Sequence, residues 1–219
     1  MLSATRLLVV AAVLSRALLV FAAGPVAGAS LQFKFDFPGS SPSHYEITVP
    51  SSGPATYTSD GQLGSGGNGD PEPLQFSLSE NVQRNIFDLA KKAHYFTGKV
   101  DSGNTKLANT GVKTLVYKDA SHDTSATYNY SLNPAVQQLT DILQKLSTVL
   151  EFGRRLTWFH KYQKLALDDD LKQMEERQRT QSLGDVEAIL PVLQQIADDS
   201  SVMRISRARA LRLLATAGK

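Results

Sequence analysis

Four histidines and no cysteine limit the side-chain chemistry available to this chain of 219 residues. His44, His94, His122 and His160 stand singly in unlike segments, without the H-x-x-x-H or H-E-x-x-H spacing that places two zinc ligands on one helix face. A histidine metal site would have to be assembled from separate elements. The lack of cysteine excludes disulfides, thiolate metal sites and a cysteine nucleophile. The sequence therefore predicts no metal ligands and no cofactor.

Residue types used in hydrolysis occur together around His122, which precedes Asp123 and lies between Ser121 and Ser125. A serine triad needs its nucleophile on a strained elbow beside an oxyanion hole, and the chain has no G-x-S-x-G motif. We interpret the segment as a turn between two strands. Sequence motifs thus identify no catalytic residue.

The segment from Gly64 to Gly69 formally matches the G-x-G-x-x-G motif of dinucleotide-binding proteins. That motif needs a strand just before it and a helix that begins within it, so that backbone N–H groups face a phosphate. Here the prolines Pro71 and Pro73 follow instead. The sequence predicts a flexible surface loop from Asp60 to Pro73.

Two charged clusters occur in the carboxyl-terminal third of the chain. The run from Asp168 to Asp170 lacks the interleaved acids, turning glycine and distal glutamate of a calcium loop, so we interpret it as a helix cap. A basic stretch without acidic residues follows Asp199, and it suits either an anionic surface or a solvated helix end, of which we favour the second. Its members are Arg204, Arg207, Arg209, Arg212 and Lys219.

Hydrophobic residues before Pro134 alternate with a period of two, which predicts strands that bury one face. The predicted strands cover Leu31 to Phe37, Tyr45 to Val49, Thr56 to Thr58, Leu74 to Leu78, Val112 to Tyr117, and Ala126 to Tyr130. One amphipathic helix interrupts them between Ser77 and Gly98, with Ser77 and Glu80 as a capping box and a start near Leu78. We expect Tyr95 and Phe96 to enter the interface that this helix forms with the sheet.

After Asn133 and Pro134, which favour a helix start, the apolar residues recur at spacings of three and four. We expect a long helix with a bend at Gly153, and then shorter helices capped by residues 168–170, 182–185 and 198–201. Pro191 should kink its helix unless that helix begins later in the chain. The predicted fold class is α+β, an antiparallel sheet covered by one helix and followed by a helical subdomain. The predicted boundaries are residues 30–131 for the sheet domain and 132–219 for the helices.

Residues 1–29 have the composition of a signal peptide. Arg6 supplies the positive start, an apolar stretch follows, and the segment from Ala27 to Ala29 fits a cleavage site, with an alternative site after Ala22. The segment holds two of the 23 basic residues and none of the 21 acids, so the remaining chain has no net charge. No attraction to nucleic acid is expected. Contact with a membrane is expected only if residues 7–23 are retained as an anchor.

The run from Tyr45 to Val49, followed by Thr56 and Tyr57 and by a helix that ends in Tyr95 and Phe96, resembles a family of exported bacterial proteins. Those proteins are uncharacterised and carry an amino-terminal strand-helix domain of unknown function. The resemblance covers the first half of the chain. It implies export to the periplasm or the medium and no particular activity.

Two hypotheses follow for function. In the first, the chain is an exported, non-enzymatic binding module of the cell envelope that contacts a protein partner through its helical half. In the second, it is an enzyme or an enzyme inhibitor whose site is assembled only in three dimensions. A pocket lined by two or more of a candidate set would favour the second, and an exposed apolar patch on the helical half would favour the first. The candidate set is His94, His122, His160, Glu151 and Asp168.

Overall fold

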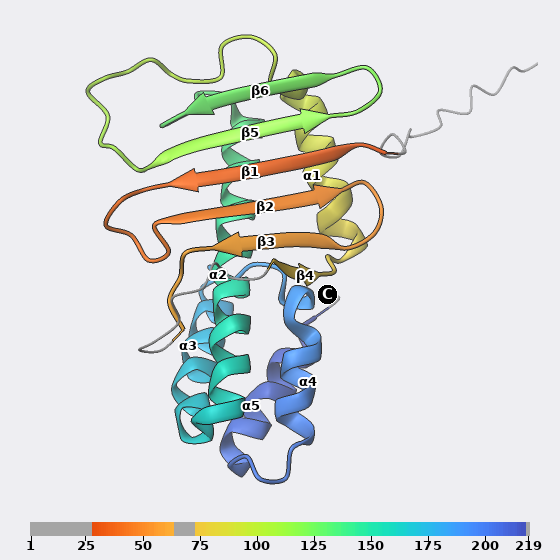
Figure 1. Ribbon diagram of the computed structural model, residues 1–219, viewed down its shortest axis with the longest axis vertical. Helices are drawn as coiled ribbons and strands as arrows, with labels where there is room; N and C mark the ends of the chain where they lie inside the picture. Colours follow the sequence, from red (N-terminus) through yellow and green to blue (C-terminus); the bar gives the residue numbers. More distant parts are fainter. Residues whose placement is uncertain (1–27, 64–72, 218–219) are drawn as a thin grey trace, which may run out of the picture.

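The computed structural model describes residues 28–63 and 73–217. The predicted signal peptide, apart from its last two residues, and the glycine motif from Gly64 to Gly69 lie outside these ranges. Within them the chain forms a six-stranded sheet and a group of helices that extends beyond one edge of that sheet (Figure 1). The predicted α+β fold with carboxyl-terminal helices is therefore confirmed.

Every neighbouring pair of strands is antiparallel, and the spatial order is β4-β3-β2-β1-β5-β6. Hairpins join β1 to β2, β2 to β3 and β5 to β6, while α1 occupies the long connection between β4 and β5. The strands are β1 Ser30–Asp36, β2 His44–Pro50, β3 Ala55–Ser59, β4 Leu74–Phe76, β5 Val112–Lys118 and β6 Asp123–Tyr128.

The central strand β1 shows how alternation defines the two faces of the sheet. Phe33 is fully buried between Ile47 of β2 and Leu115 of β5, whereas Lys34 on the opposite face lies across from Glu46 and pairs with it at 3.2 Å. Because side chains of a strand alternate in direction, the apolar set turns to one side and the polar set to the other.

Lys113 departs from this pattern, because it lies on the inner face and is only 4% exposed. Its ammonium group donates to the carbonyl oxygens of Thr110 at 3.1 Å, Gly111 at 3.0 Å and Asn129 at 2.9 Å. Burial lowers the pKa of this ammonium group. The contacts hold the loop before β5 and the end of β6 together.

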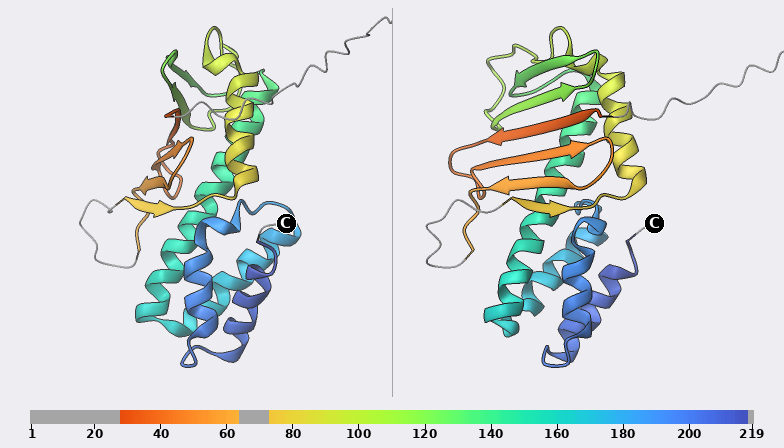
Figure 2. Two further views of the ribbon diagram at one scale, coloured as in Figure 1. Left: turned by 90° about the vertical axis from the view of Figure 1, so that its right-hand side faces the viewer. Right: turned by 45° about the vertical axis from the view of Figure 1, so that its right-hand side comes forward.

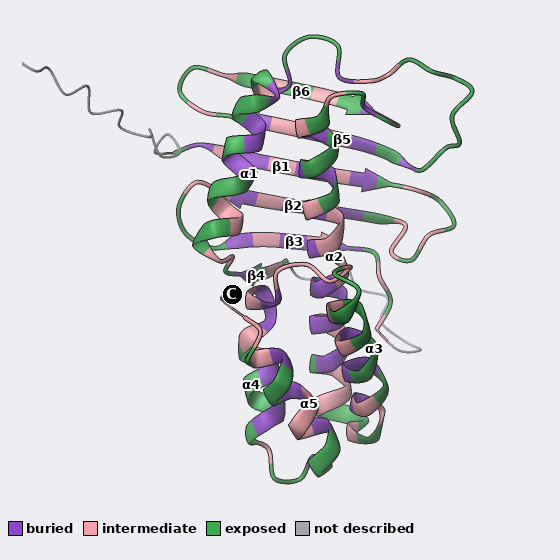
Figure 3. Ribbon diagram, turned by 180° about the vertical axis from the view of Figure 1, so that it is seen from behind, coloured by how far each residue is buried: buried purple, intermediate pink, exposed green. Residues whose placement is uncertain are grey.

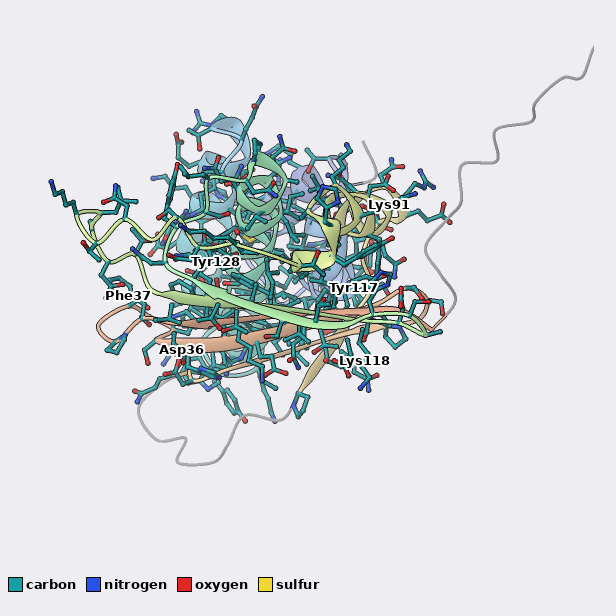
Figure 4. The ribbon with its side chains drawn as sticks, turned by 90° about the horizontal axis from the view of Figure 1, so that it is seen from above. Asp36, Phe37, Lys91, Tyr117, Lys118 and Tyr128 are labelled. Atoms are coloured by element: carbon teal, nitrogen blue, oxygen red, sulfur yellow. The ribbon has the colours of Figure 1, made fainter. Side chains whose placement is uncertain are left out.

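Two helices cover the apolar face of the sheet (Figure 2). They are α1, Glu80–Lys92, and the first half of α2, Pro134–Tyr162, so the structure adds α2 to the single predicted covering helix. The view from above shows Tyr117 and Tyr128 on the helix side of the sheet, with Lys91 projecting from α1 away from it (Figure 4). Buried residues run along the strands and continue down α2 beyond the sheet (Figure 3).

The predicted capping box of α1 is wrong by two residues. Ser79 rather than Ser77 is the N-cap, and its hydroxyl accepts from the N–H of Val82 at 3.4 Å. Ser79 also donates its N–H and its hydroxyl to Asp185, both at 2.9 Å. A carboxylate 106 residues away in sequence thus selects the start of this helix.

The chain leaves α1 through a short 3₁₀ turn, His94–Phe96, whose three residues all have positive φ. Phe96 is buried, as predicted, and Tyr95 is half-buried with its ring centroid 4.7 Å from that of Tyr117 and 4.2 Å from that of His122. Left-handed backbone is costly for residues with a Cβ, so these aromatic contacts offset local strain.

The helical half contains α3 Leu167–Arg179, α4 Leu190–Asp198 and α5 Arg204–Leu214, with 3₁₀ turns at Lys164–Ala166 and Val186–Ile189. Two predicted helix caps are wrong. The aspartates 168–170 occupy the first turn of α3 rather than its cap, where their charge suits the helix dipole. The last helix, α5, begins at Arg204 without a side-chain cap. Pro191 lies in the first turn of α4, so the helix begins late enough for the proline to cause no kink, which is the second of the two predicted outcomes.

Gly153 was predicted to bend the long helix, yet α2 continues through it for a total of 29 residues. A Cβ atom at this position would lie 2.5 Å from Cγ2 of Ile189 in the turn that precedes α4. The absence of a side chain therefore permits close packing between α2 and that turn, rather than a change in helix direction.

Substitution of Gly153 by Ala tests this account. Alanine favours a helix by about 1 kcal/mol over glycine, but the clash with buried Ile189 should reverse the sign and destabilise the protein by about 1 to 3 kcal/mol. Chemical denaturation measures the difference, and an added Ile189→Ala change should recover part of it. A Gly153→Ala protein as stable as the wild type would show that the contact is not tight.

Candidate functional site

A buried carboxylate joins the sheet to the helical half. One oxygen of Glu151 on α2 accepts hydrogen bonds from the hydroxyls of Tyr57 at 2.9 Å and Ser59 at 2.6 Å, and from Arg154 at 2.9 Å. Arg154 also donates to the carbonyl of Gly61 at 3.0 Å. Burial and the charge of Glu151 raise the pKa of Tyr57, so its hydroxyl remains a donor. These bonds fix α2 against the end of β3.

A cleft of about 540 Å³ opens beside Glu151, between the β1–β2 loop, α2 and α3. Arg155 lies in its wall and donates from Nε to Asp170 of α3 at 2.9 Å. The guanidinium carbon of Arg155 is 4.4 Å from the ring centroid of Phe152, and that of Arg177 is 5.9 Å from the same ring. The cleft therefore combines an aromatic surface with two guanidinium groups.

The β1–β2 loop forms the outer wall of this cleft and is held by its own hydrogen bonds. The hydroxyl of Ser40 donates to the carbonyls of Phe37 at 2.8 Å and Pro42 at 2.7 Å. Asp60, just after β3, accepts from the backbone N–H groups of Ser43 at 2.9 Å and His44 at 3.0 Å. The wall is thus formed before any ligand binds.

The structure separates the sequence candidates from one another. Of the candidate set, Glu151 alone lines this cleft, and none of three further hollows on the described residues is lined by any member of the set. Three histidines instead pair with nearby aspartates. The pairs are His44 with Asp36 at 2.6 Å, His122 with Asp119 at 3.1 Å, and His160 with Asp199 at 2.8 Å.

The turn between β5 and β6 explains the residues around His122. Asp119 accepts from the N–H groups of Ser121 at 2.6 Å and His122 at 2.7 Å, and from the hydroxyl of Tyr117 at 3.0 Å. Burial alone would raise the pKa of Asp119, but these hydrogen bonds lower it to about 2. The segment is a turn, as the sequence predicted, with Asp123 as the first residue of β6.

The far end of the helical half exposes large apolar side chains, which we call the apolar tip. Its members are Tyr162, Leu165, Met203 and Ile205. Leu165 is 77% exposed and Ile205 is 51% exposed. Asp199 lies in the connection between α4 and α5. It accepts a hydrogen bond from Lys164 at 2.6 Å and pairs with His160 of α2 at 2.8 Å. The end of α2 and the connection that leads into α5 are therefore adjacent.

Ion pairs inside the helical half use part of the basic stretch that the sequence left open. Arg209 pairs with Asp168 at 2.9 Å and also with Glu175, and Arg212 pairs with Glu175 at 2.7 Å. The arginines of α5 thus hold it against α3, and our interpretation of a simply solvated helix end is wrong for these two. The aspartate run and the basic stretch are partners in the fold.

Sequence reasoning missed the residues that build the cleft and its anchor. The sequence places Tyr57 in the third predicted strand without a further role, and it predicts no role for Ser59, Arg154 or Arg155. The usable signal is Glu151, a carboxylate that directly follows Leu150 of the apolar row in the predicted long helix.

No protein-family model matches the chain, and no curated protein matches it either. Among residues 28–63 and 73–217, no helix has both the length and the apolar character needed to cross a membrane. In the same ranges, no group of three or more histidine, aspartate or glutamate side chains is arranged to hold a metal ion.

Replacement of Glu151 by Gln tests the anchor between the two halves. The change leaves the charge of Arg154 without its partner in a site where both side chains are nearly buried, so we expect a loss of about 3 kcal/mol or more in unfolding free energy. Glu176→Gln breaks an exposed pair with Arg179 and should cost less than about 1 kcal/mol. Equal losses in the two variants would contradict the assignment.

Asp119 should contribute to the acid sensitivity of stability. Its folded-state pKa of about 2 lies below the ordinary value of 3.8, so the folded state favours the ionised form. The stabilisation is complete above the ordinary pKa and is lost as pH falls from about 4 to about 2. Unfolding free energies measured across this range should fall less steeply for Asp119→Asn than for the wild type. Parallel curves would exclude this role.

Proposed function

We propose that this chain is an exported, non-enzymatic binding module of the cell envelope, and that its apolar tip contacts a protein partner. The exposure of Leu165 and Ile205, on two segments that Asp199 links, is the observation that carries the proposal. Monomeric soluble proteins rarely present large apolar side chains together unless the surface is used for association. The tip lies at the end of the molecule farthest from the sheet (Figure 1).

The composition around the tip also favours a protein partner. The ring of Trp158 packs against that of Tyr162, with centroids 5.4 Å apart. Aromatic residues are enriched at protein interfaces because they bury a large area at a low entropy cost. The exposed cation Lys161 stands beside Tyr162, with its ammonium 5.0 Å from the ring centroid, and would form part of a polar rim. An apolar centre with a charged rim is the usual arrangement of such surfaces.

The enzyme hypothesis receives less support. A pocket lined by two members of the candidate set would favour it, and the described clefts contain Glu151 alone of that set. The bonded oxygen of that carboxylate already accepts three hydrogen bonds, so it is poorly placed to act as a base.

Export rests on the composition of residues 1–29. The first strand begins at Ser30, the residue that follows the predicted cleavage site after Ala29. A mature chain that starts there would retain every strand of the sheet. Retention of residues 7–23 as an anchor would place the same module on the membrane surface.

Site-specific cross-linking in intact cells tests the proposal. A photo-reactive amino acid at position 165 should yield a discrete protein adduct in the envelope fraction, and Ile205→Ser should reduce that adduct by about tenfold or more. The same photo-reactive group at position 132 is the control, because Leu132 is 72% exposed on the connection between β6 and α2. Equal adducts at both positions, no adduct at position 165, or a purely cytoplasmic chain would refute the proposal.

A further inference from the structure

The cleft beside Glu151 carries one positive charge that the protein itself does not balance. Asp170 pairs with Arg155, and Glu151 pairs with Arg154. Arg177, which also lines the cleft and is exposed on α3, forms no ion pair within the described residues. An anion that enters the cleft would therefore find an unmatched guanidinium group.

The position of Arg177 suits recognition of a carboxylate. It stands over the ring of Phe152 at 5.9 Å, as Arg155 does at 4.4 Å. A guanidinium group that lies over an aromatic ring keeps its N–H edge available, and that planar edge matches the two oxygens of a carboxylate. Phe152 is buried and orients both cations.

The rest of the lining indicates an organic body rather than an inorganic ion. Phe35, Pro42 and Tyr45 present apolar surface on the sheet side. The amides of Gln144 and Gln173 also line the cleft, and neither side chain is hydrogen-bonded in the part of the chain that the structure describes. Apolar walls with a few polar groups are typical of small-molecule sites, and about 540 Å³ lies within their usual volume.

Charge also limits the number of negative groups on the ligand. Two carboxylates, Glu151 and Asp170, line the same cleft as Arg177. A doubly charged phosphate would be repelled by both, whereas a single carboxylate balances the one unmatched cation.

We propose that this cleft binds a small organic monocarboxylate, with its carboxylate on Arg177 and its apolar body against Pro42 of the loop wall. The site is distinct from the apolar tip and does not depend on the proposed protein partner. Because the loop wall and the Arg155–Asp170 pair are already in place, the ligand enters a preformed site.

Titration of the full-length chain with phenylacetate tests the site. Nuclear magnetic resonance should show shifts of the Arg177 side chain and of the backbone around Pro42, and phenylacetamide, which lacks the charge, should bind about tenfold or more weakly. Arg177→Gln should weaken phenylacetate binding by about tenfold or more. Arg179→Gln is the matched control, because Arg179 is exposed on the same helix and pairs with Glu176. The Arg179→Gln protein should bind phenylacetate as tightly as the wild type.

Three results would overturn the proposal. The first is no shift at the cleft with phenylacetate up to about 10 mM, which corresponds to negligible affinity. The second is equal affinity in the wild type and Arg177→Gln. The third is inorganic phosphate that binds at the cleft as tightly as phenylacetate. Leu165→Ser should leave phenylacetate binding unchanged, which separates this test from the one on the apolar tip.

Discussion

A carboxylate buried between a helix and a sheet edge is stable only if donors surround it, and Glu151 meets this condition with groups from two elements. Two hydroxyls come from β3 and one guanidinium comes from the same helix. Leaving such a charge without partners would cost several kcal/mol. Both hydroxyls reach the carboxylate only at one placement of α2 along the sheet, whereas Arg154 reaches it from within the helix. The helical half is carried by α2, so its position also depends on this contact.

The same helix carries further polar positions on its buried side. The hydroxyl of Tyr128 on β6 lies 2.6 Å from that of Thr140. This pair begins a row of tyrosine hydroxyls along the helix, and the row ends where Tyr57 donates to Glu151. Between them, burial raises the pKa of Tyr45 to about 12, and the Ser147 hydroxyl opposes that shift. Apolar burial supplies most of the stability. The hydroxyls specify how the helix lies on the sheet, because they meet their partners at only one register.

Periodicity was enough to predict the strands and the long helix, because Phe33 or Leu143 needs only a buried face and not a particular partner. The errors arise where a distant residue decides a local feature. Hydrogen bonds to Asp185 place the cap of α1 at Ser79 rather than Ser77. Close packing against Ile189 explains why residue 153 is a glycine. The cleft was not predicted for the same reason, since Arg177 and Phe152 meet only after α3 folds back on α2.

The cleft and the apolar tip lie on the same helix, yet the contacts between them favour independent sites. Arg155 holds Asp170 near the start of α3, and Arg209 of α5 holds Asp168 in the same turn. Both ion pairs are formed within the protein. An anion bound to Arg177 therefore cannot form a new contact between α3 and its neighbouring helices. Coupling between distant sites requires an element with two arrangements of similar energy. A helix clamped from both sides by ion pairs transmits little, and each site should keep its own affinity when the other is filled.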